Sequence, residues 1–282
     1  MSAFWIILTG SLVAGFCALL GSFLLLRKMT MLGDAISHSV LPGIVAAFIL
    51  SGSRESFTLI IGAAILGLMT VFIIEWLHKK LRMQADASIG MTYTFLFAVG
   101  VILISGQVGN VDLDQDCVLY GEIAFVSLDT WNTENGTSLG PVKVWVTGGM
   151  FIFTLVFILL SWKQLKITTF DPAFAQASGI SSALWHYLLM GMVSIATVTA
   201  FDAVGAILVV AFLSVPAAAA FLLTRKLNHM LFIAVCIGVL AAVGGYFLSS
   251  AINSSVSGAM AVVAGIIFFL SWGISKFRTG FS

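Results

Sequence analysis

The sequence predicts an all-α integral membrane protein with about nine membrane-spanning helices, within a range of eight to ten. Its 282 residues are 60% hydrophobic and only 9% charged, and the mean hydropathy is +1.11. A water-soluble domain carries about 25% charged residues, so this composition excludes a water-soluble protein. The apolar runs are about 17 to 23 residues long, which favours helices over the alternating ten-residue strands of an outer-membrane barrel.

The apolar segments follow one another along the chain as one transmembrane domain over residues 1–282. The sixth and seventh segments are separated only by Phe201 and Asp202, which mark either a tight hairpin between two full spans or a re-entrant element. The expected spans are residues 4–26, 31–50, 57–74, 89–104, 142–162, 183–201, 203–223, 230–248 and 258–275.

The basic residues predict the orientation of the spans. Eleven of the 13 lysines and arginines fall in alternate connections, and only Arg54 and Lys143 fall on the other side. Because cytoplasmic connections carry the excess of positive charge, we expect an extracytoplasmic N-terminus and a cytoplasmic C-terminus. An odd number of spans agrees with this, since it places the two ends on opposite faces.

The second span begins with the polar stretch GDAISHSVLPG. Asp34 and His38 are four residues apart, so they project from one face of a helix, and Pro42 continues this stripe and can kink the span. A helix that starts just after Lys28 would raise His38 by about 15 Å, near the middle of the hydrocarbon core. Ionisable groups at that depth are costly and are usually functional.

The chemistry of Asp34 and His38 suggests a metal pathway. A carboxylate and an imidazole suit Mn²⁺, Fe²⁺ or Zn²⁺. One span offers too few ligands for a closed four-coordinate site, but a two-fold dimer would bring two such pairs to a shared axis. Two other interpretations stay open: a structural pair of Asp34 with His38 or with Arg27, and a proton relay.

Two connections are long enough to have functions of their own. The outer one, residues 105–141, has no lysine or arginine before Pro141 and is either a cation-attracting surface or a solvated loop. The inner one, residues 163–182, contains FDPAFAQASGI, in which Asp171 caps a short helix, Pro172 opens it and Gly179 ends it. This helix is a candidate cytoplasmic docking surface. The acidic residues of the outer connection are Asp112, Asp114, Asp116, Glu122, Asp129 and Glu134.

Two further segments carry expectations. The segment from Glu75 to Lys80 is predicted to be the interfacial end of the third span, with cations that extend towards the headgroups. Asp202 precedes AVGAILVVAFLSVPAAAA, whose small residues permit close helix packing and in which Pro216 is expected to interrupt the helix. Because broken helices often line pathways, we expect Pro42, Asp202 and Pro216 to line a gate or pathway. Asp202 is alternatively an interface residue or a helix cap.

Three segments resemble the membrane permeases of ABC importers for manganese, zinc and iron. They are RKMTMLGDAISHSVLPGIV in the second span, DLDQDCVLYGEIAFVSLD in the outer loop, and FDPAFAQASGI followed by FDAVGAILVVAFLSVPAAAAFLLTRKL. The resemblance extends over about residues 4–275. The outer loop departs from the commoner pattern, because cysteine and tyrosine stand where histidine and phenylalanine are usual. This departure leaves open the metal, the role of Cys117 and pairing with a different permease chain.

The resemblance implies a fold similar to type II ABC importers, which usually have ten spans. It implies that Asp34 and His38 bind the metal, and that Asp202–Ala220 lines the pathway near the outer gate. The implied partners are cytoplasmic ABC ATPase subunits, an extracytoplasmic metal-binding lipoprotein or periplasmic protein, and a second permease chain, identical or not. The implied location is the bacterial inner membrane. The residues implied to dock on the ATPase are Asp171, Pro172, Phe174, Ala175 and Gly179.

The chain is not expected to be an enzyme. It has no GxxxxGK[ST] phosphate loop, so a separate subunit would hydrolyse ATP. An intramembrane enzyme is disfavoured because HExxH is absent and no second intramembrane acid or histidine lies close in sequence to Asp34 and His38. The expected function is therefore the permease of an ATP-driven Mn²⁺, Zn²⁺ or Fe²⁺ importer with no permanently bound cofactor and no nucleic-acid partner. The alternative is a proton-coupled secondary metal transporter.

Overall fold

The computed structural model describes residues 2–39, 41–51, 56–107, 123–127, 130–132 and 138–279. Within these ranges, nine helices are long and apolar enough to span a membrane, which confirms the predicted number. The helices are α1 (Ser2–Leu26), α2 (Leu32–Ser39), α3 (Leu41–Ser51), α4 (Ser56–Lys80), α5 (Ala85–Gln107), α7 (Val142–Leu160), α8 (Trp162–Phe170), α9 (Pro172–Ala177), α10 (Ser182–Val204), α11 (Ala206–Leu223), α12 (Leu227–Ile252) and α13 (Val256–Thr279). In this count α2 and α3 together form one span, and α8 and α9 are too short to span.

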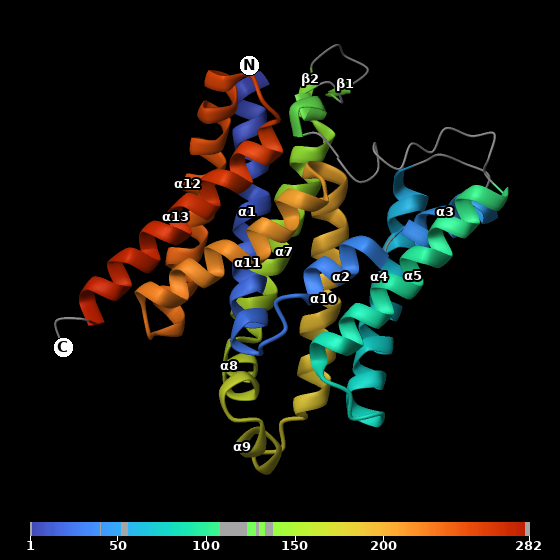
Figure 1. The fold of residues 1–282 in the computed structure, drawn as a ribbon, viewed down its shortest axis with the longest axis vertical. Helices are drawn as coiled ribbons and strands as arrows, with labels where there is room; N and C mark the ends of the chain where they lie inside the picture. Colours follow the sequence, from blue (N-terminus) through green and yellow to red (C-terminus); the bar gives the residue numbers. More distant parts are fainter. Residues whose placement is uncertain are drawn as a thin grey trace.

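The long helices form two groups that meet at α2 and α10 (Figure 1). In one group α1, α11, α12 and α13 pack closely on one another, with α7 against α1. In the other group α3, α4 and α5 pack together. Helix α2 contacts α4 and α5 on one side and α10 and α11 on the other, so it lies where the two groups meet.

Helices α1 and α11 cross at Gly21. A Cβ atom placed on Gly21 would overlap the backbone carbonyl of Leu213, so only glycine permits this approach. The surrounding core includes the fully buried rings of Phe16, Phe23 and Phe212. Large rings beside a bare backbone crossing fill the space between the helices without voids.

The structure corrects the expectation for Pro216. Helix α11 runs without a break from Ala206 to Leu223 with Pro216 buried inside it, so the proline does not interrupt the span. Its neighbours α1 and α13 pack along α11, and such packing tolerates a proline within a membrane helix. The chain instead turns at Gly205, whose φ of 85° ends α10, and α10 and α11 are two separate spans.

The boundaries of two helices also differ from the prediction. Helix α1 ends in a left-handed turn at Lys28, whose φ is 59°, and α2 begins only at Leu32. The assumed helix start just after Lys28 is therefore wrong. Helix α4 continues past the predicted apolar span to Lys80, where the sequence predicts the helix end, and Glu75, which pairs with Lys79 one turn later, is buried.

The outer connection is described only in part. It contains the 3₁₀ helix η1 (Ile123–Ser127) and the short antiparallel strands β1 (Thr130–Asn132) and β2 (Ser138–Pro141). Cys117, Arg54 and all six acidic residues singled out in the sequence lie outside the described residues.

Candidate functional site

Asp34 and His38 lie on one face of α2, as predicted. His38 Nε2 is 3.4 Å from Asp34 Oδ1, and their side chains are 34% and 36% exposed, respectively. The other described α2 side chains are buried, so the pair is the accessible polar part of a helix that is otherwise packed. The structure does not bring Arg27 to Asp34; Arg27 bonds elsewhere, as described below.

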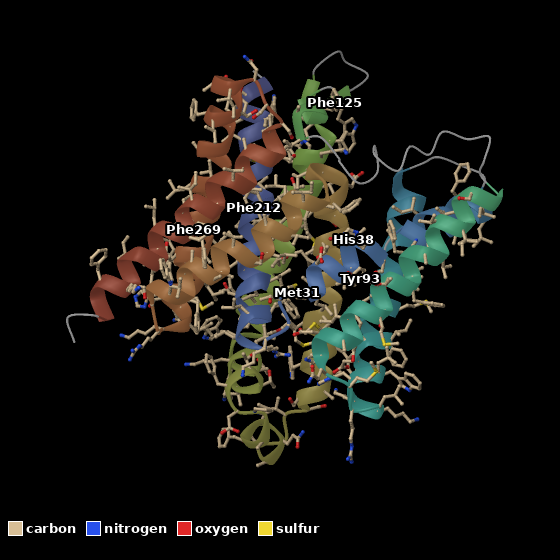
Figure 2. The ribbon with its side chains drawn as sticks, in the orientation of Figure 1. Met31, His38, Tyr93, Phe125, Phe212 and Phe269 are labelled. Atoms are coloured by element: carbon tan, nitrogen blue, oxygen red, sulfur yellow. The ribbon has the colours of Figure 1, made fainter. Side chains whose placement is uncertain are left out.

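Helix α5 supplies an aromatic wall beside this pair. The ring centroids of Tyr93 and Phe97 lie 5.9 Å and 6.1 Å from that of His38, and Figure 2 shows Tyr93 next to His38 where α2 meets α5. Tyr93 and Phe97 are four residues apart, so they share one helix face. Tyr93 and Phe97 were not predicted from the sequence, although their spacing in TYTFLF is a usable signal. The two rings limit the orientations that the imidazole can adopt.

The pair can coordinate a divalent metal only incompletely. It offers a carboxylate oxygen and an imidazole nitrogen, ligands that suit Mn²⁺, Fe²⁺ and Zn²⁺. Across the part of the chain that the structure describes, no group of three or more His, Cys, Asp or Glu residues could hold a metal ion. Further ligands are needed to complete the coordination, and a two-ligand site of this kind favours reversible binding.

The other predicted pathway residues are not drawn into this pair. Pro42 is buried in α3 and Pro216 in α11. Asp202, in the last turn of α10, lies 3.5 Å from Lys143 Nζ, which also donates to the Asp202 backbone oxygen over 2.5 Å. This contact joins the start of α7 to the end of α10. Lys143, one of the two basic residues that the charge pattern places on the outer side, thus links these two helix ends.

The predicted docking helix is present as α9, at one extreme end of the molecule (Figure 1). Asp171 Oδ1 accepts from the Phe174 amide over 2.9 Å, and Pro172 occupies the first turn. At the other end, Gly179 has a φ of 76° and the Ile180 amide donates to the Ala175 oxygen over 2.9 Å. These are the bonds of a capped helix that ends at a left-handed glycine.

One side of α9 is exposed and apolar. Ala175 is buried against the rest of the chain, whereas Phe174 is 57% exposed. A groove of about 490 Å³ lies along α8 and the start of α9, and its lining includes Phe170, Lys163 and Lys166. An exposed phenylalanine beside lysines is a surface suited to contact with another protein.

We expect Asp171→Ala to weaken α9 by about 1 kcal/mol, because the Phe174 amide would lose its acceptor. If α9 docks on a partner as a helix, the dissociation constant for that partner should rise about fivefold. The measurement is a binding titration with the purified partner. Asp171→Asn keeps an acceptor and is the matched control. Equal effects of the two variants would contradict a capping role.

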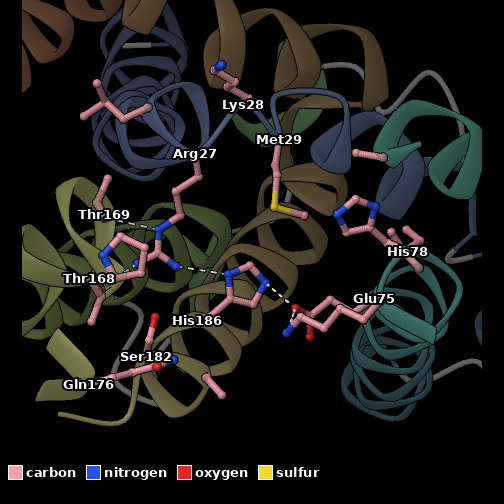
Figure 3. Close-up of a pocket in the computed structure, with 16 residues that line it drawn as sticks. Arg27, Lys28, Met29, Glu75, His78, Thr168, Thr169, Gln176, Ser182 and His186 are labelled. Atoms are coloured by element: carbon pink, nitrogen blue, oxygen red, sulfur yellow. Dashed lines mark hydrogen bonds and ion pairs between the residues drawn. The ribbon is translucent and has the colours of Figure 1, made fainter. Parts of the chain in front are cut away.

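A second polar site, which we call the Arg27 cluster, joins residues from α4, α8 and α10 to the residue after α1. Arg27 Nε donates to Thr169 Oγ1 over 3.2 Å, and Nη2 donates to Thr168 Oγ1 over 3.1 Å (Figure 3). Arg27 Nη1 lies 3.1 Å from His186 Nδ1. The members of the cluster are Arg27, Glu75, Lys79, Thr168, Thr169 and His186.

Glu75 is the acidic member of the Arg27 cluster. Its Oε1 lies 3.0 Å from His186 Nε2 and 2.6 Å from Lys79 Nζ, and its side chain is only 4% exposed. The cluster borders a cavity of about 680 Å³. Burial lowers the pKa of Arg27, yet an arginine keeps its charge in proteins, so it remains a cation here. The sequence predicts Glu75 at the interfacial end of a span, and it gives no signal for His186.

The chain resembles known membrane transport proteins over most of its length. The chain is 50% identical to the manganese transport system membrane protein MntD of Bacillus subtilis over 266 residues, 94% of this chain and 89% of the relative. It is 42% identical to the zinc transport system membrane protein TroD of Treponema pallidum over 270 residues, 94% of this chain and 72% of the relative.

Solved structures show the same fold. PsaBC from Streptococcus pneumoniae, in complex with Fab, superposes with a TM-score of 0.77 at 33% identity and covers 95% of this chain and 90% of the matched chain. An inward-facing structure of metal-chelate ABC transporter type has a TM-score of 0.67 at 15% identity, which supports the fold alone. The model of the ABC 3 transport family matches residues 2–275. The chain therefore belongs to the ABC 3 transport family and is a metal ABC importer permease with a type II importer-like, all-helical membrane fold.

Proposed function

We propose that this chain moves Mn²⁺ into the cytoplasm as the permease subunit of an ATP-driven importer, with Asp34 and His38 as the metal ligands in its pathway. The observation that carries the proposal is the 3.4 Å pair on α2, accessible on an otherwise buried helix. Its oxygen and nitrogen ligands suit Mn²⁺. The relative that is 50% identical is named as a manganese transport protein, although TroD, at 42%, is named for zinc.

The proposed mechanism assigns the chemistry of ATP to a partner. A cytoplasmic ATPase docks on α9, whose exposed Phe174 and neighbouring lysines form the contact. A binding protein delivers the metal at the opposite face, where the start of α7 and the end of α10 lie. The N-terminus is extracytoplasmic and a second permease chain completes the pore. Weak, two-ligand coordination lets the ion pass on, because tight binding would slow its release.

The test is uptake of Mn²⁺ and Zn²⁺ by cells that lack their own importers and express the complete transport system. We expect Asp34→Asn and His38→Gln each to reduce Mn²⁺ uptake at least tenfold, because the first removes the carboxylate charge and the second removes the imidazole. Membrane accumulation is measured in parallel. Asp86→Asn, an exposed acid in the first turn of α5, is the matched control and should transport normally.

Three outcomes would contradict the proposal. Normal Mn²⁺ uptake by both variants would make the pair structural. If the wild type takes up Zn²⁺ but not Mn²⁺, and the variants lose the uptake of Zn²⁺, the transported metal is Zn²⁺ and not Mn²⁺. Uptake that persists with a catalytically dead ATPase but stops when the proton gradient is dissipated would favour the proton-coupled carrier.

A further inference from the structure

His186 bridges an arginine and a glutamate through its two ring nitrogens. A guanidinium only donates hydrogen bonds, so His186 Nδ1 accepts from Arg27 Nη1 and the ring hydrogen belongs on Nε2. That nitrogen faces Glu75 Oε1 at 3.0 Å (Figure 3). The chemistry of the two neighbours thus assigns one tautomer and one ring orientation to His186, and the bridge holds α4, α10 and the end of α1 together.

The Arg27 cluster also reaches the base of α9. Arg27 donates to the hydroxyl groups of Thr168 and Thr169, which lie in the last turn of α8. Only Asp171 separates α8 from α9, and α9 packs on α8. A displacement of α9 would therefore move the two threonines and change the length of their hydrogen bonds to Arg27.

On the opposite side, the Arg27 cluster connects to α2 through α4. Thr70 lies on α4 five residues before Glu75, and its hydroxyl oxygen is 2.8 Å from that of Ser39, with both side chains fully buried. Ser39 directly follows His38. Helix α4 thus joins the carboxylate of Glu75 to the hydrogen bond between Thr70 and Ser39, which lies next to the Asp34–His38 pair.

We propose that Arg27, His186, Glu75 and Thr70 are positioning residues that transmit movement of α9 to the Asp34–His38 pair. The proposal rests on the proposed function, since it names the route by which an ATPase on α9 changes access to the metal. The route combines hydrogen bonds at Arg27 and Thr70, the 3.0 Å contact of His186 with Glu75, and the helix α4 itself, and it runs across α8, α10, α4 and α2. None of these four residues needs to touch the ion, and the metal affinity of the pair is separate from the coupling.

The test separates coupling from folding and from binding. Glu75→Gln and Thr70→Val are made in the complete complex, reconstituted in vesicles with its ATPase and binding protein. Glu75→Gln removes the charge that holds the bridge and Lys79, whereas Thr70→Val removes only a hydroxyl at nearly constant shape. We measure ATPase co-purification, Mn²⁺ binding, and Mn²⁺ transported per ATP hydrolysed.

We expect both variants to keep the ATPase and to bind Mn²⁺ within twofold of the wild type, but to carry at least tenfold less metal per ATP. Thr94→Val on α5 is the matched control, because Thr94 is exposed and its hydroxyl donates within its own helix to Gly90. Its transport ratio should not change.

The outcomes distinguish this inference from the proposed function. If the wild-type complex transports Mn²⁺ and both variants keep its ratio, only the coupling role is overturned. A parallel loss of accumulation, binding and transport in Thr70→Val would show a merely structural role and also overturn it. If the wild-type complex neither binds nor transports a divalent metal, the proposed function fails and the inference fails with it.

Discussion

Replacing Gly21 with alanine should strongly reduce the amount of folded protein in the membrane. A Cβ atom at this position would overlap the Leu213 carbonyl, which belongs to the backbone of α11 and cannot rotate away. The two helices would have to separate, and overpacking of this kind costs about 1–3 kcal/mol and occasionally more. The measurement is membrane accumulation together with the thermal unfolding midpoint in detergent, and Gly21→Val should leave no folded protein.

The matched control is Gly265→Ala in α13. A Cβ atom on Gly265 meets nothing within 4 Å, so this change adds the same methyl group without a clash. Since alanine is favoured over glycine in helices by about 1 kcal/mol, the control should be neutral or slightly stabilising. An unfolding midpoint for Gly21→Ala equal to that of the wild type would refute the close crossing of α1 and α11.

Replacing Gly179 with valine should abolish ATP-driven uptake while leaving metal binding intact. A β-branched residue is strongly disfavoured at the φ of 76° found here, so the helix end that directs the chain from α9 to α10 would be lost. Nothing lies within 4 Å of a Cβ at Gly179, so the effect comes from the backbone and not from a clash within this chain. Uptake and ATPase co-purification are measured with the complete system.

Gly179→Asn provides the control, because asparagine adopts the left-handed conformation more readily than valine does. It should retain most of the uptake if the backbone conformation decides the effect. A valine variant that still co-purifies with the ATPase and transports normally would contradict the proposal that α9 is the docking helix. A variant that loses Mn²⁺ binding as well would point to global unfolding instead.

Features set by neighbouring residues were predictable from the sequence. The lengths of the apolar runs predict the nine spans, and the residues from Asp171 to Gly179 predict α9 because its caps form within a few positions. The spacing of Asp34 and His38 likewise predicts that they share a face. In each case the interaction that decides the structure is local, so the pattern contains it.

Features set by packing were not predictable in the same way. Arg27 and His186 are 159 positions apart, and neither residue signals the other in the sequence. Pro216 is expected from the sequence to interrupt its helix, but α11 continues through the proline, packed against α1 and α13. The residues around Glu75 likewise do not signal that its side chain is buried beside His186, which is 111 positions away. These outcomes depend on which helices meet, and no local pattern states that.

The self-contained construction of α9 has an evolutionary consequence. Its start is fixed by Asp171, its end by Gly179 and Ile180, and Ala175 is its buried side chain. Such a unit can exchange its outward residues without disturbing the helices that surround Asp34 and His38. If α9 docks on the ATPase and Asp34 and His38 bind the metal, as proposed, these two functions can diverge independently. Grafting this short segment between related permeases should then swap their ATPases while each keeps its metal.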